Sequence, residues 1–367
     1  MMHKMQKLCL LGAGSIAASL FAAWPAFADD APKFFQLQAE LPLKSSATTT
    51  DHVDYDPVKK LLYMSRRKDG VTVVDVTTMK VVAQIPKTEG SNSIALVPKH
   101  DRGYTGNGDG TTTIFKLSDN TVIDRVSFAT NSDGGIYEPV SDSIAFQQAD
   151  DGIIALMNAE TGKKSGEVKL EGEELERPVA DGKGNIFVPI RDKDLLFKVD
   201  VKGMKVAAKW DISASCQQPS GADYDAANNR VILGCRGKMV APTLVVVDAD
   251  SGKVVSSTPL GRGCDEVQFD AGSKQVFTAN GVDGNAIVYK QVDADHYAPT
   301  EAFSTRPGAR VLRYDADSQR IFIMSNAGTQ DLNKKNALAR FNPWYVNTIF
   351  PDSLSLLVYG RGPAAAK

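Results

Sequence analysis

Beyond about residue 30, the chain alternates short apolar stretches with polar turns. Residues 61–64, 71–74 and 244–247 are such stretches, and they are rich in Val and Leu. β-branched and aromatic residues pack well on a pleated surface, and stretches this short suit strands. Residues 249–253 read Ala-Asp-Ser-Gly-Lys, in which Gly supplies the positive φ that a hairpin turn requires. The pattern therefore predicts short antiparallel strands joined by hairpins.

This pattern repeats seven times. In each copy the first strand ends at an equivalent position, which we call the anchor. The anchors are Asp56, Val97, Glu138, Asp181, Asp225, Asp270 and Asp315. They lie 41, 41, 43, 44, 45 and 45 residues apart, and three further strand-like segments generally follow each one. Four antiparallel strands at this period are typical of a propeller blade. The sequence therefore predicts an all-β fold, a seven-bladed β-propeller with four antiparallel strands per blade.

The two ends of the chain complete the seventh copy. Its third strand is predicted at residues 354–359, and no fourth strand follows. Residues 34–41, ahead of the first copy, form a strand-like segment that can supply it. We therefore expect the N-terminal strand to close the ring in the last blade, whereas an open β-solenoid would leave both strands unpaired. An insertion at about 325–350 interrupts this copy, and we expect a lid over the channel mouth, a partner-binding surface, or packing along the seventh blade.

The first residues resemble an export signal. Residues 1–7 carry positive charge, residues 8–24 are apolar, and small residues precede Asp29. This order predicts a secretory signal peptide over residues 1–28 with cleavage after Ala28, and a single membrane anchor is the alternative. Residues 29–367 would then form one propeller that is periplasmic or secreted. We expect a monomer without a transmembrane segment after cleavage.

Three phrases resemble the seven-bladed propellers of the YVTN-repeat family, a group of exported bacterial proteins. They are Thr-Val-Val-Asp-Val-Thr-Thr-Met-Lys-Val-Val at 72–82, Val-Val-Val-Asp-Ala-Asp-Ser-Gly-Lys-Val-Val at 245–255, and the closing phrase at 351–361. The resemblance covers about residues 34–361 and implies a scaffold whose molecular functions are mostly unassigned. Residues 292–297 of the sixth copy depart from it, because they lack the Gly-Lys turn. Cys216 and Cys235 also resemble a cysteine pair of similar exported propellers.

The cysteines suggest a disulfide bond. Export places the protein in an oxidising compartment, where disulfides form. The turn between the first two strands of the fifth copy brings Cys235 close to Cys216, so we predict that these two are paired. Cys264 is the competing partner, and three buried reduced cysteines are the other alternative.

Composition excludes several classes of function. The chain has 42 basic and 44 acidic residues, a balance that argues against binding to duplex nucleic acid. It has only four histidines, and it contains no Gly-x-Ser-x-Gly, His-Glu-x-x-His or Cys-x-x-Cys-His motif. Any chemistry is therefore left to carboxylates, arginines and a single well-placed histidine.

One face of a propeller carries the starts of its inner strands and the loops between second and third strands. The residues that we predict there as ligand-binding candidates are Asp51, Arg66, Asn92, Arg177, Arg191, Arg236, Asp265, Arg306 and Arg310. The same face also includes Arg67, Asp133 and Glu266. Guanidinium groups bind carboxylates and phosphates in bidentate geometry, so this face suits a small polar or anionic ligand. The alternatives are solvated loop residues and arginines that pair with neighbouring Asp and Glu.

The function predicted from these residues is an exported binding or scaffold protein, whose partner is a small polar or anionic molecule or an envelope protein. The alternative is a metal-dependent lactonase-type hydrolase or a lyase on the same face. No cofactor is certain, but a divalent cation such as calcium is a candidate, with ligands from Glu176, Asn280 and Asp265 and also Asp51 and Asn92. His52 is the candidate general base, although a lone loop histidine is often a bystander.

Overall fold

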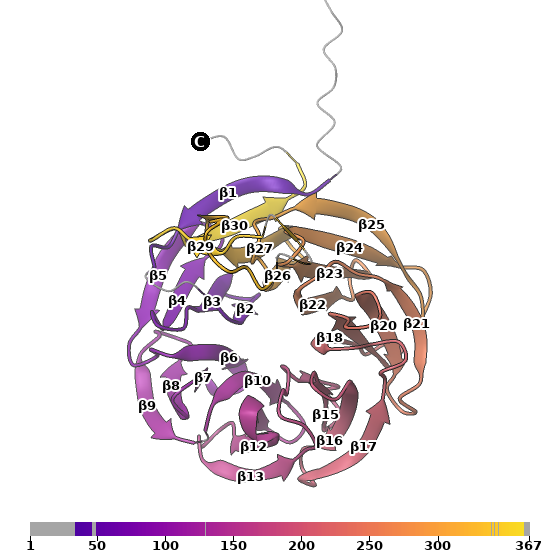
Figure 1. The fold of residues 1–367 in the computed structure, drawn as a ribbon. Helices are drawn as coiled ribbons and strands as arrows, with labels where there is room; N and C mark the ends of the chain where they lie inside the picture. Colours follow the sequence, from indigo (N-terminus) through magenta and orange to yellow (C-terminus); the bar gives the residue numbers. More distant parts are fainter. Residues whose placement is uncertain are drawn as a thin grey trace, which may run out of the picture. The chain divides into compact units, whose positions relative to one another are not determined.

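The structure is a computed structural model of the chain, and it describes residues 34–45, 49–128, 130–338, 340, 342–343 and 345–362. The predicted signal peptide at residues 1–28 lies outside the described residues. Seven four-stranded antiparallel sheets stand around a common axis (Figure 1). The prediction of a seven-bladed β-propeller is confirmed.

The strands of blades 1 to 6 follow one another in the chain from the channel outward. Blade 1 contains β2 (Val53–Asp56), β3 (Leu61–Ser65), β4 (Val71–Asp75) and β5 (Lys80–Ile85), and blade 2 contains β6 (Ser91–Val97), β7 (Arg102–Asn107), β8 (Thr111–Lys116) and β9 (Val122–Ser127). Blade 3 contains β10 (Ser132–Glu138), β11 (Ser143–Gln148), β12 (Ile153–Asn158) and β13 (Lys164–Lys169), and blade 4 contains β14 (Val179–Ala180), β15 (Asn185–Ile190), β16 (Leu195–Asp200) and β17 (Lys205–Asp211). Blade 5 contains β18 (Pro219–Asp225), β19 (Arg230–Cys235), β20 (Thr243–Asp248) and β21 (Val254–Pro259), and blade 6 contains β22 (Cys264–Asp270), β23 (Gln275–Asn280), β24 (Asn285–Gln291) and β25 (Tyr297–Ser304).

Blade 7 combines both ends of the chain. It contains β26 (Leu312–Asp315), β27 (Arg320–Ser325), β30 (Ser355–Gly360) and, outermost, β1 (Gln36–Pro42). The short pair β28 (Gly328–Thr329) and β29 (Thr348–Ile349) lies in the insertion. The described helices are two single 3-10 turns, η1 (Pro98–His100) and η2 (Ala149–Asp151), so no described helix is long enough to cross a membrane.

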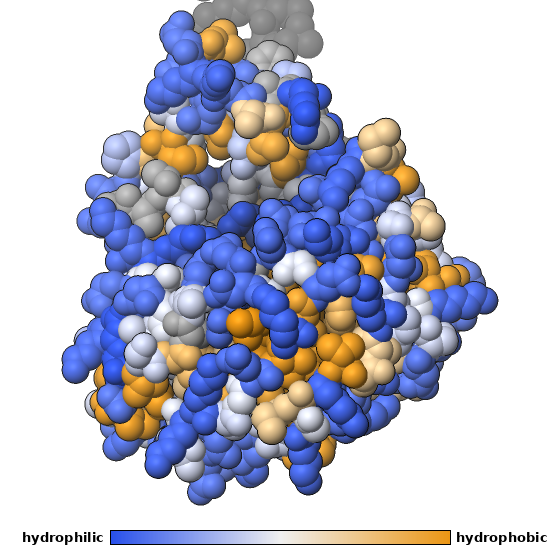
Figure 2. Space-filling model, turned by 60° about the horizontal axis from the view of Figure 1, so that its bottom comes forward, coloured by the Kyte–Doolittle hydropathy of each residue, from blue (hydrophilic) through white to orange (hydrophobic). Residues whose placement is uncertain are grey.

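The hydrophobic core lies between the blades, because the middle strands of each sheet are buried on both faces. All six residues of β11 are buried, and in blade 4 the ring of Phe187 stacks on Tyr224 of blade 5 with 5.8 Å between ring centroids. The outer strands face solvent instead, and most residues of β5 are exposed. Figure 2 turns the β13 side of the ring forward and shows a mainly hydrophilic surface on which some apolar side chains gather in a patch.

The acidic anchors shape the turns between first and second strands. Asp56 Oδ1 accepts hydrogen bonds from the backbone N–H groups of Val58 and Lys59, at 2.9 Å each. Glu138 Oε1 accepts the backbone N–H of Val140 within its own turn, and it also accepts the backbone N–H of Gly184 in the next blade, at 3.1 Å each. These side-chain-capped turns explain why an acid recurs at this repeat position.

The ring closes as predicted. β1 pairs antiparallel with β30, from Gln36 opposite Gly360 to Pro42 opposite Ser355. Arg361 then reaches blade 6, where its guanidinium pairs with Glu301 at 2.8 Å. The closing strand therefore completes blade 7, and the residue after β30 fastens it to blade 6.

The sixth blade forms its outer hairpin although it lacks the Gly-Lys turn. The strands β24 and β25 pair along their length. Asp293 Oδ1 accepts the backbone N–H groups of Asp295 and His296, at 2.9 Å each. This Asp-capped turn replaces the missing glycine turn.

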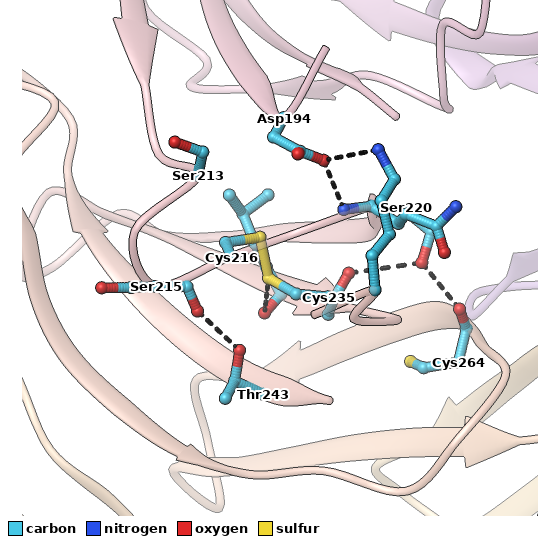
Figure 3. Close-up of a disulfide and its surroundings, with 12 residues drawn as sticks. Asp194, Ser213, Ser215, Cys216, Ser220, Cys235, Thr243 and Cys264 are labelled. Atoms are coloured by element: carbon cyan, nitrogen blue, oxygen red, sulfur yellow. Dashed lines mark hydrogen bonds and ion pairs between the residues drawn. A yellow bond between two sulfur atoms is a disulfide. The ribbon is translucent and has the colours of Figure 1, made fainter. Parts of the chain in front are cut away.

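The predicted disulfide is also confirmed. Cys216 and Cys235 are bonded, with their Cα atoms 5.2 Å apart (Figure 3). Cys264, the competing partner, is a free and buried cysteine. Its carbonyl accepts a hydrogen bond from the Ser220 hydroxyl at 2.6 Å, which ties blade 6 to the disulfide-bearing blade 5.

Candidate functional site

One repeat position places a polar residue at the channel mouth of every blade. It lies five residues before the anchor, and its occupants are Asp51, Asn92, Asp133, Glu176, Ser220, Asp265 and Arg310. In blades 2, 3 and 6, where this residue is Asn92, Asp133 or Asp265, it falls at a break in the register between the first and second strands. Such a bulge leaves one residue out of the ladder and turns its side chain. The local backbone thus presents these polar groups at the end of each inner strand.

A single carboxylate joins four blades further into the channel. Glu266 of blade 6 lies with Oε2 3.3 Å from Nδ1 of His52 in blade 1, and its Oε1 accepts hydrogen bonds from Arg177 of blade 4 at 3.1 Å and Arg313 of blade 7 at 2.5 Å. Glu266 and Arg313 are both buried. Burial alone would raise the pKa of Glu266, but the charges of Arg313 and Arg177 and the His52 hydrogen bond hold that pKa well below its usual range.

A second group of charges lies around Asp265. Its carboxylate pairs with Arg236 of blade 5 and with Nε of Arg310 of blade 7, the latter at 2.9 Å. Two guanidinium groups thus share one carboxylate. Burial lowers the pKa of Arg236, and the neighbouring positive charges of Arg191 and Arg310 act in the same direction.

Blades 1, 3 and 4 contribute carboxylates to the same mouth. Asp51 pairs with Arg67, and Glu176 pairs with Arg191. Burial raises the pKa of both Asp51 and Glu176, and the negative charge of Asp133 adds to each shift. Asp133 itself has no ion-pair partner among the described residues.

Two of the predicted ligand-binding arginines, Arg66 and Arg306, have partners outside the groups of charges around Glu266 and Asp265. Arg66 is buried and donates to the Thr72 hydroxyl at 2.9 Å and to the carbonyl of Lys44 at 2.6 Å. Arg306 pairs with Glu40 of β1 at 2.8 Å. Neither arginine is paired with Glu266 or Asp265. The alternative that the arginines pair with neighbouring Asp and Glu holds for all six candidates, which are Arg66, Arg177, Arg191, Arg236, Arg306 and Arg310.

The amide nitrogens of the two asparagine metal candidates are engaged within the protein, whereas the buried side-chain oxygen of Asn280 has no hydrogen-bond partner among the described residues. The Asn92 amide donates to the Ser132 carbonyl at 3.1 Å, and the Asn280 amide donates to Asn285 at 2.9 Å. Within the part of the chain that the structure describes, no group of three or more His, Cys, Asp or Glu side chains is arranged to hold a metal ion.

Sequence reasoning missed Arg313 and Asp223 and gave Glu266 no role. The repeat contains the signal, because the position two residues before the anchor is polar in blades 1, 5, 6 and 7. Its occupants there are Asp54, Asp223, Gln268 and Arg313. Asp223 accepts the backbone N–H of Phe269 at 2.6 Å and Gln268 accepts that of Tyr314 at 2.8 Å, so each bonds to the next blade. Burial raises the pKa of Asp223 to about 6.

The two ends of the channel have separate cavities. One of about 120 Å³ lies between the start of blade 7 and the insertion, and Arg310 and Tyr345 line it. The other, of about 300 Å³, lies at the opposite mouth, where Asp54, Gln268 and Arg313 line it. The insertion reaches beyond its own blade, because the Asn342 amide donates to the Val282 carbonyl of blade 6 at 2.7 Å. Part of the insertion therefore lies at the predicted ligand face.

Comparisons with known proteins bear on the fold alone. No family model and no curated protein matches the chain. Among solved structures, 1807 chains match, so likeness to any one of them does not identify a function. One is a chain of the Kuenenia stuttgartiensis hydrazine synthase, with a TM-score of 0.66, 12% sequence identity, and coverage of 77% of this chain and 94% of that chain. At this identity the similarity supports the propeller fold and nothing more specific.

Proposed function

We propose that the protein is an exported propeller of the YVTN-repeat family that binds a small polar or anionic ligand at its channel mouth. The observation that carries the proposal is the sharing of Asp265 by Arg236 and Arg310, which brings two guanidinium groups together at the mouth. Arg67 and Arg310 each keep 38% of their side chain exposed. A second anionic group can therefore approach these guanidinium groups without breaking the existing pairs.

Binding has more support than proton transfer. His52 is only 6% exposed, its Nδ1 lies 3.3 Å from Glu266, and its Nε2 lies 3.8 Å from Asp51. A general base must reach the proton that it removes. An imidazole enclosed between two carboxylates is better suited to holding blades together than to meeting a substrate.

The test is a thermal-shift and calorimetric screen of the purified mature protein with organic acids, sugars and lactones. A ligand that binds only the folded protein raises the melting temperature. We expect anionic compounds to give the shift and the double variant Arg177→Ala, Arg310→Ala to lose it. Arg230→Gln is the control, because Arg230 pairs with Asp248 and Asp295 away from this mouth. An unchanged affinity in the double variant would remove the anion site.

A metal-dependent lactonase-type hydrolase or a lyase is the competing proposal. The carboxylate candidates fit a cation poorly, since Glu176 and Asp265 pair with arginines and the described residues contain no group of three or more His, Cys, Asp or Glu side chains arranged to hold a metal ion. We therefore assign no catalytic step to a metal. Metal analysis of the purified protein, together with lactone hydrolysis before and after chelation, distinguishes the two: hydrolysis that needs added calcium would favour the enzyme.

Export is part of the proposal and is tested separately. The mass of the protein recovered from the bacterial envelope fraction should correspond to a chain that begins at Asp29, because the signal is predicted to end at Ala28. Envelope proteins that copurify with the protein would support the other predicted class of partner.

A further inference from the structure

The cavity beside Arg310 has one charged wall and one apolar wall. Thr49, Thr50 and Arg310 line one part of it, and Tyr345, Val346 and Ile349 of the insertion line another. Its volume is about 120 Å³. Pockets for drug-sized ligands begin at about 300 Å³, so only a small molecule fits here.

Hydrogen bonds fix the insertion that covers this cavity. The Asn347 amide donates to the Asp331 carbonyl at 2.9 Å, and the backbone N–H of Asp331 donates back to Asn347 Oδ1 at 2.7 Å. The Asn336 amide donates to the Tyr345 carbonyl at 2.8 Å. Together with the β28–β29 pair and the bond from Asn342 to blade 6, these contacts hold Tyr345 and its neighbours in place. The apolar side of the cavity is therefore formed by residues that these bonds hold in place, and not by an exposed loop end.

Arg310 has donor capacity left for a ligand. Its Nε is held by Asp265 at 2.9 Å, and its Nη2 donates to the Thr50 carbonyl at a long 3.4 Å. Among the described residues, none accepts a hydrogen bond from Nη1. Asp265 also serves Arg236, so Arg310 shares its only close ion-pair partner among the described residues with a second arginine.

We infer that this cavity binds a short aliphatic monocarboxylate, with its carboxylate on Arg310 and its chain against Val346 and Ile349. This inference rests on the proposed function and names its ligand class. A single arginine lines the cavity, so one negative group is matched by a cation and a second carboxylate would meet no second cation among the lining residues. The small volume and the apolar wall favour a fatty acid of few carbons over a phosphate or a sugar.

The experiment is calorimetry of the mature protein with acetate, butyrate, hexanoate, decanoate and succinate at low salt. We expect butyrate or hexanoate to bind best, with no further gain in affinity for decanoate, whose chain is longer than the cavity, and with succinate at least tenfold weaker. A charge-assisted hydrogen bond is worth about 1.5–3 kcal/mol, so Arg310→Gln should weaken binding by tenfold or more. Arg310→Lys should restore part of the affinity, and Arg230→Gln should leave it unchanged.

A second variant tests the apolar wall. Ile349→Phe fills part of the cavity and should shift the preference toward acetate, while the variant's melting temperature without ligand shows that it is folded. If succinate or another anion binds and the binding depends on Arg177 but not on Arg310 or Ile349, this inference is wrong and the proposed function survives. If no anion binds the wild-type protein but a sugar or another neutral polar compound does, this inference is wrong and the proposed function survives. If neither binds, both are wrong.

Discussion

Glu266 connects blade 6 to three other blades in the inner channel. His52, Arg177 and Arg313 come from three different blades, and all three bond to this one carboxylate. Buried charges are tolerated only when they are paired and hydrogen-bonded. Glu266 therefore compensates Arg177, which has no other ion-pair partner among the described residues, and is the closer of two carboxylates paired with Arg313, whose Nε also lies 4.0 Å from Asp54.

The first prediction concerns the loss of this charge. Glu266→Gln keeps the shape of the side chain but leaves Arg177 without a paired carboxylate and Arg313 with only Asp54, at 4.0 Å. Removing one partner of a buried pair costs about 3–5 kcal/mol, so we expect the free energy of unfolding to fall by that order in urea titrations. Glu174→Gln is the matched control, because Glu174 pairs with Arg191 while 47% of its side chain is exposed, and its loss should cost less than about 1 kcal/mol. Equal losses in the two variants would contradict the central role of Glu266.

The second prediction concerns pH and Asp223. Burial raises its pKa from 3.8 to about 6, so the folded protein holds this proton more tightly than the unfolded chain does. The stabilising contribution is fully present below pH 4 and is lost as the pH rises through 6. The difference in unfolding free energy between wild type and Asp223→Asn should therefore fall by about 1–3 kcal/mol between pH 4 and pH 7, at 1.36 kcal/mol per unit of pKa shift. A difference that does not change with pH would show that the carboxyl has an ordinary pKa.

At the scale of elements, the disulfide fastens the segment before β18 to the end of β19. It joins residues that are 19 apart in the sequence. Closing a loop of about this length restricts the unfolded chain and contributes about 3 kcal/mol. The bridge thus stabilises the blade that carries Arg236, one of the two arginines on Asp265.

The third prediction follows from this bridge. The double variant Cys216→Ala, Cys235→Ala should lose about 3 kcal/mol of unfolding free energy while keeping its far-ultraviolet circular dichroism. Thiol counting supplies the control. The denatured, non-reduced mature protein should show one free thiol, and the native protein should show none, because Cys264 is buried and its thiol pKa is raised to about 12. Three thiols in the denatured protein would mean that the bridge does not form.

The strands were predictable from the sequence, whereas the pairs across the channel were not. A period near 43 residues determines which residues occupy equivalent places, so blades, anchors and the closing strand could all be derived. His52, Arg177 and Glu266 share the position four residues before the anchor, but that position recurs in seven blades. His52 and Glu266 are 214 residues apart, and which of seven side chains meet across the channel depends on their lengths and on the bulges. The repeat thus predicts which residues lie at the channel face, but it does not predict which of them form ion pairs.

At the scale of the whole molecule, the ring is held together by contacts between consecutive blades. Lys60 of blade 1 pairs with Asp315 of blade 7 at 3.2 Å, and the Asp223 and Gln268 side chains each accept a backbone N–H of the following blade. Only blade 7 is assembled from both ends of the chain. The closing strand β1 therefore decides whether these contacts form a closed ring or an open arc.

The last prediction tests this closure. A chain that begins at Thr49 lacks β1 and leaves the edge of β30 unpaired, and an exposed strand edge promotes association between chains. We expect this variant to be less stable than a control chain that begins at Phe34 and to form oligomers in size-exclusion chromatography with light scattering.

A synthetic peptide of residues 34–45 should restore the monomer in proportion to its concentration, because strand addition supplies the missing backbone hydrogen bonds. The same peptide with Ala39 and Leu41 changed to Asp should fail, since both residues pack against the core between blades 7 and 1. A monomeric, equally stable chain from Thr49 onward would show that the contacts between blades suffice without the strand.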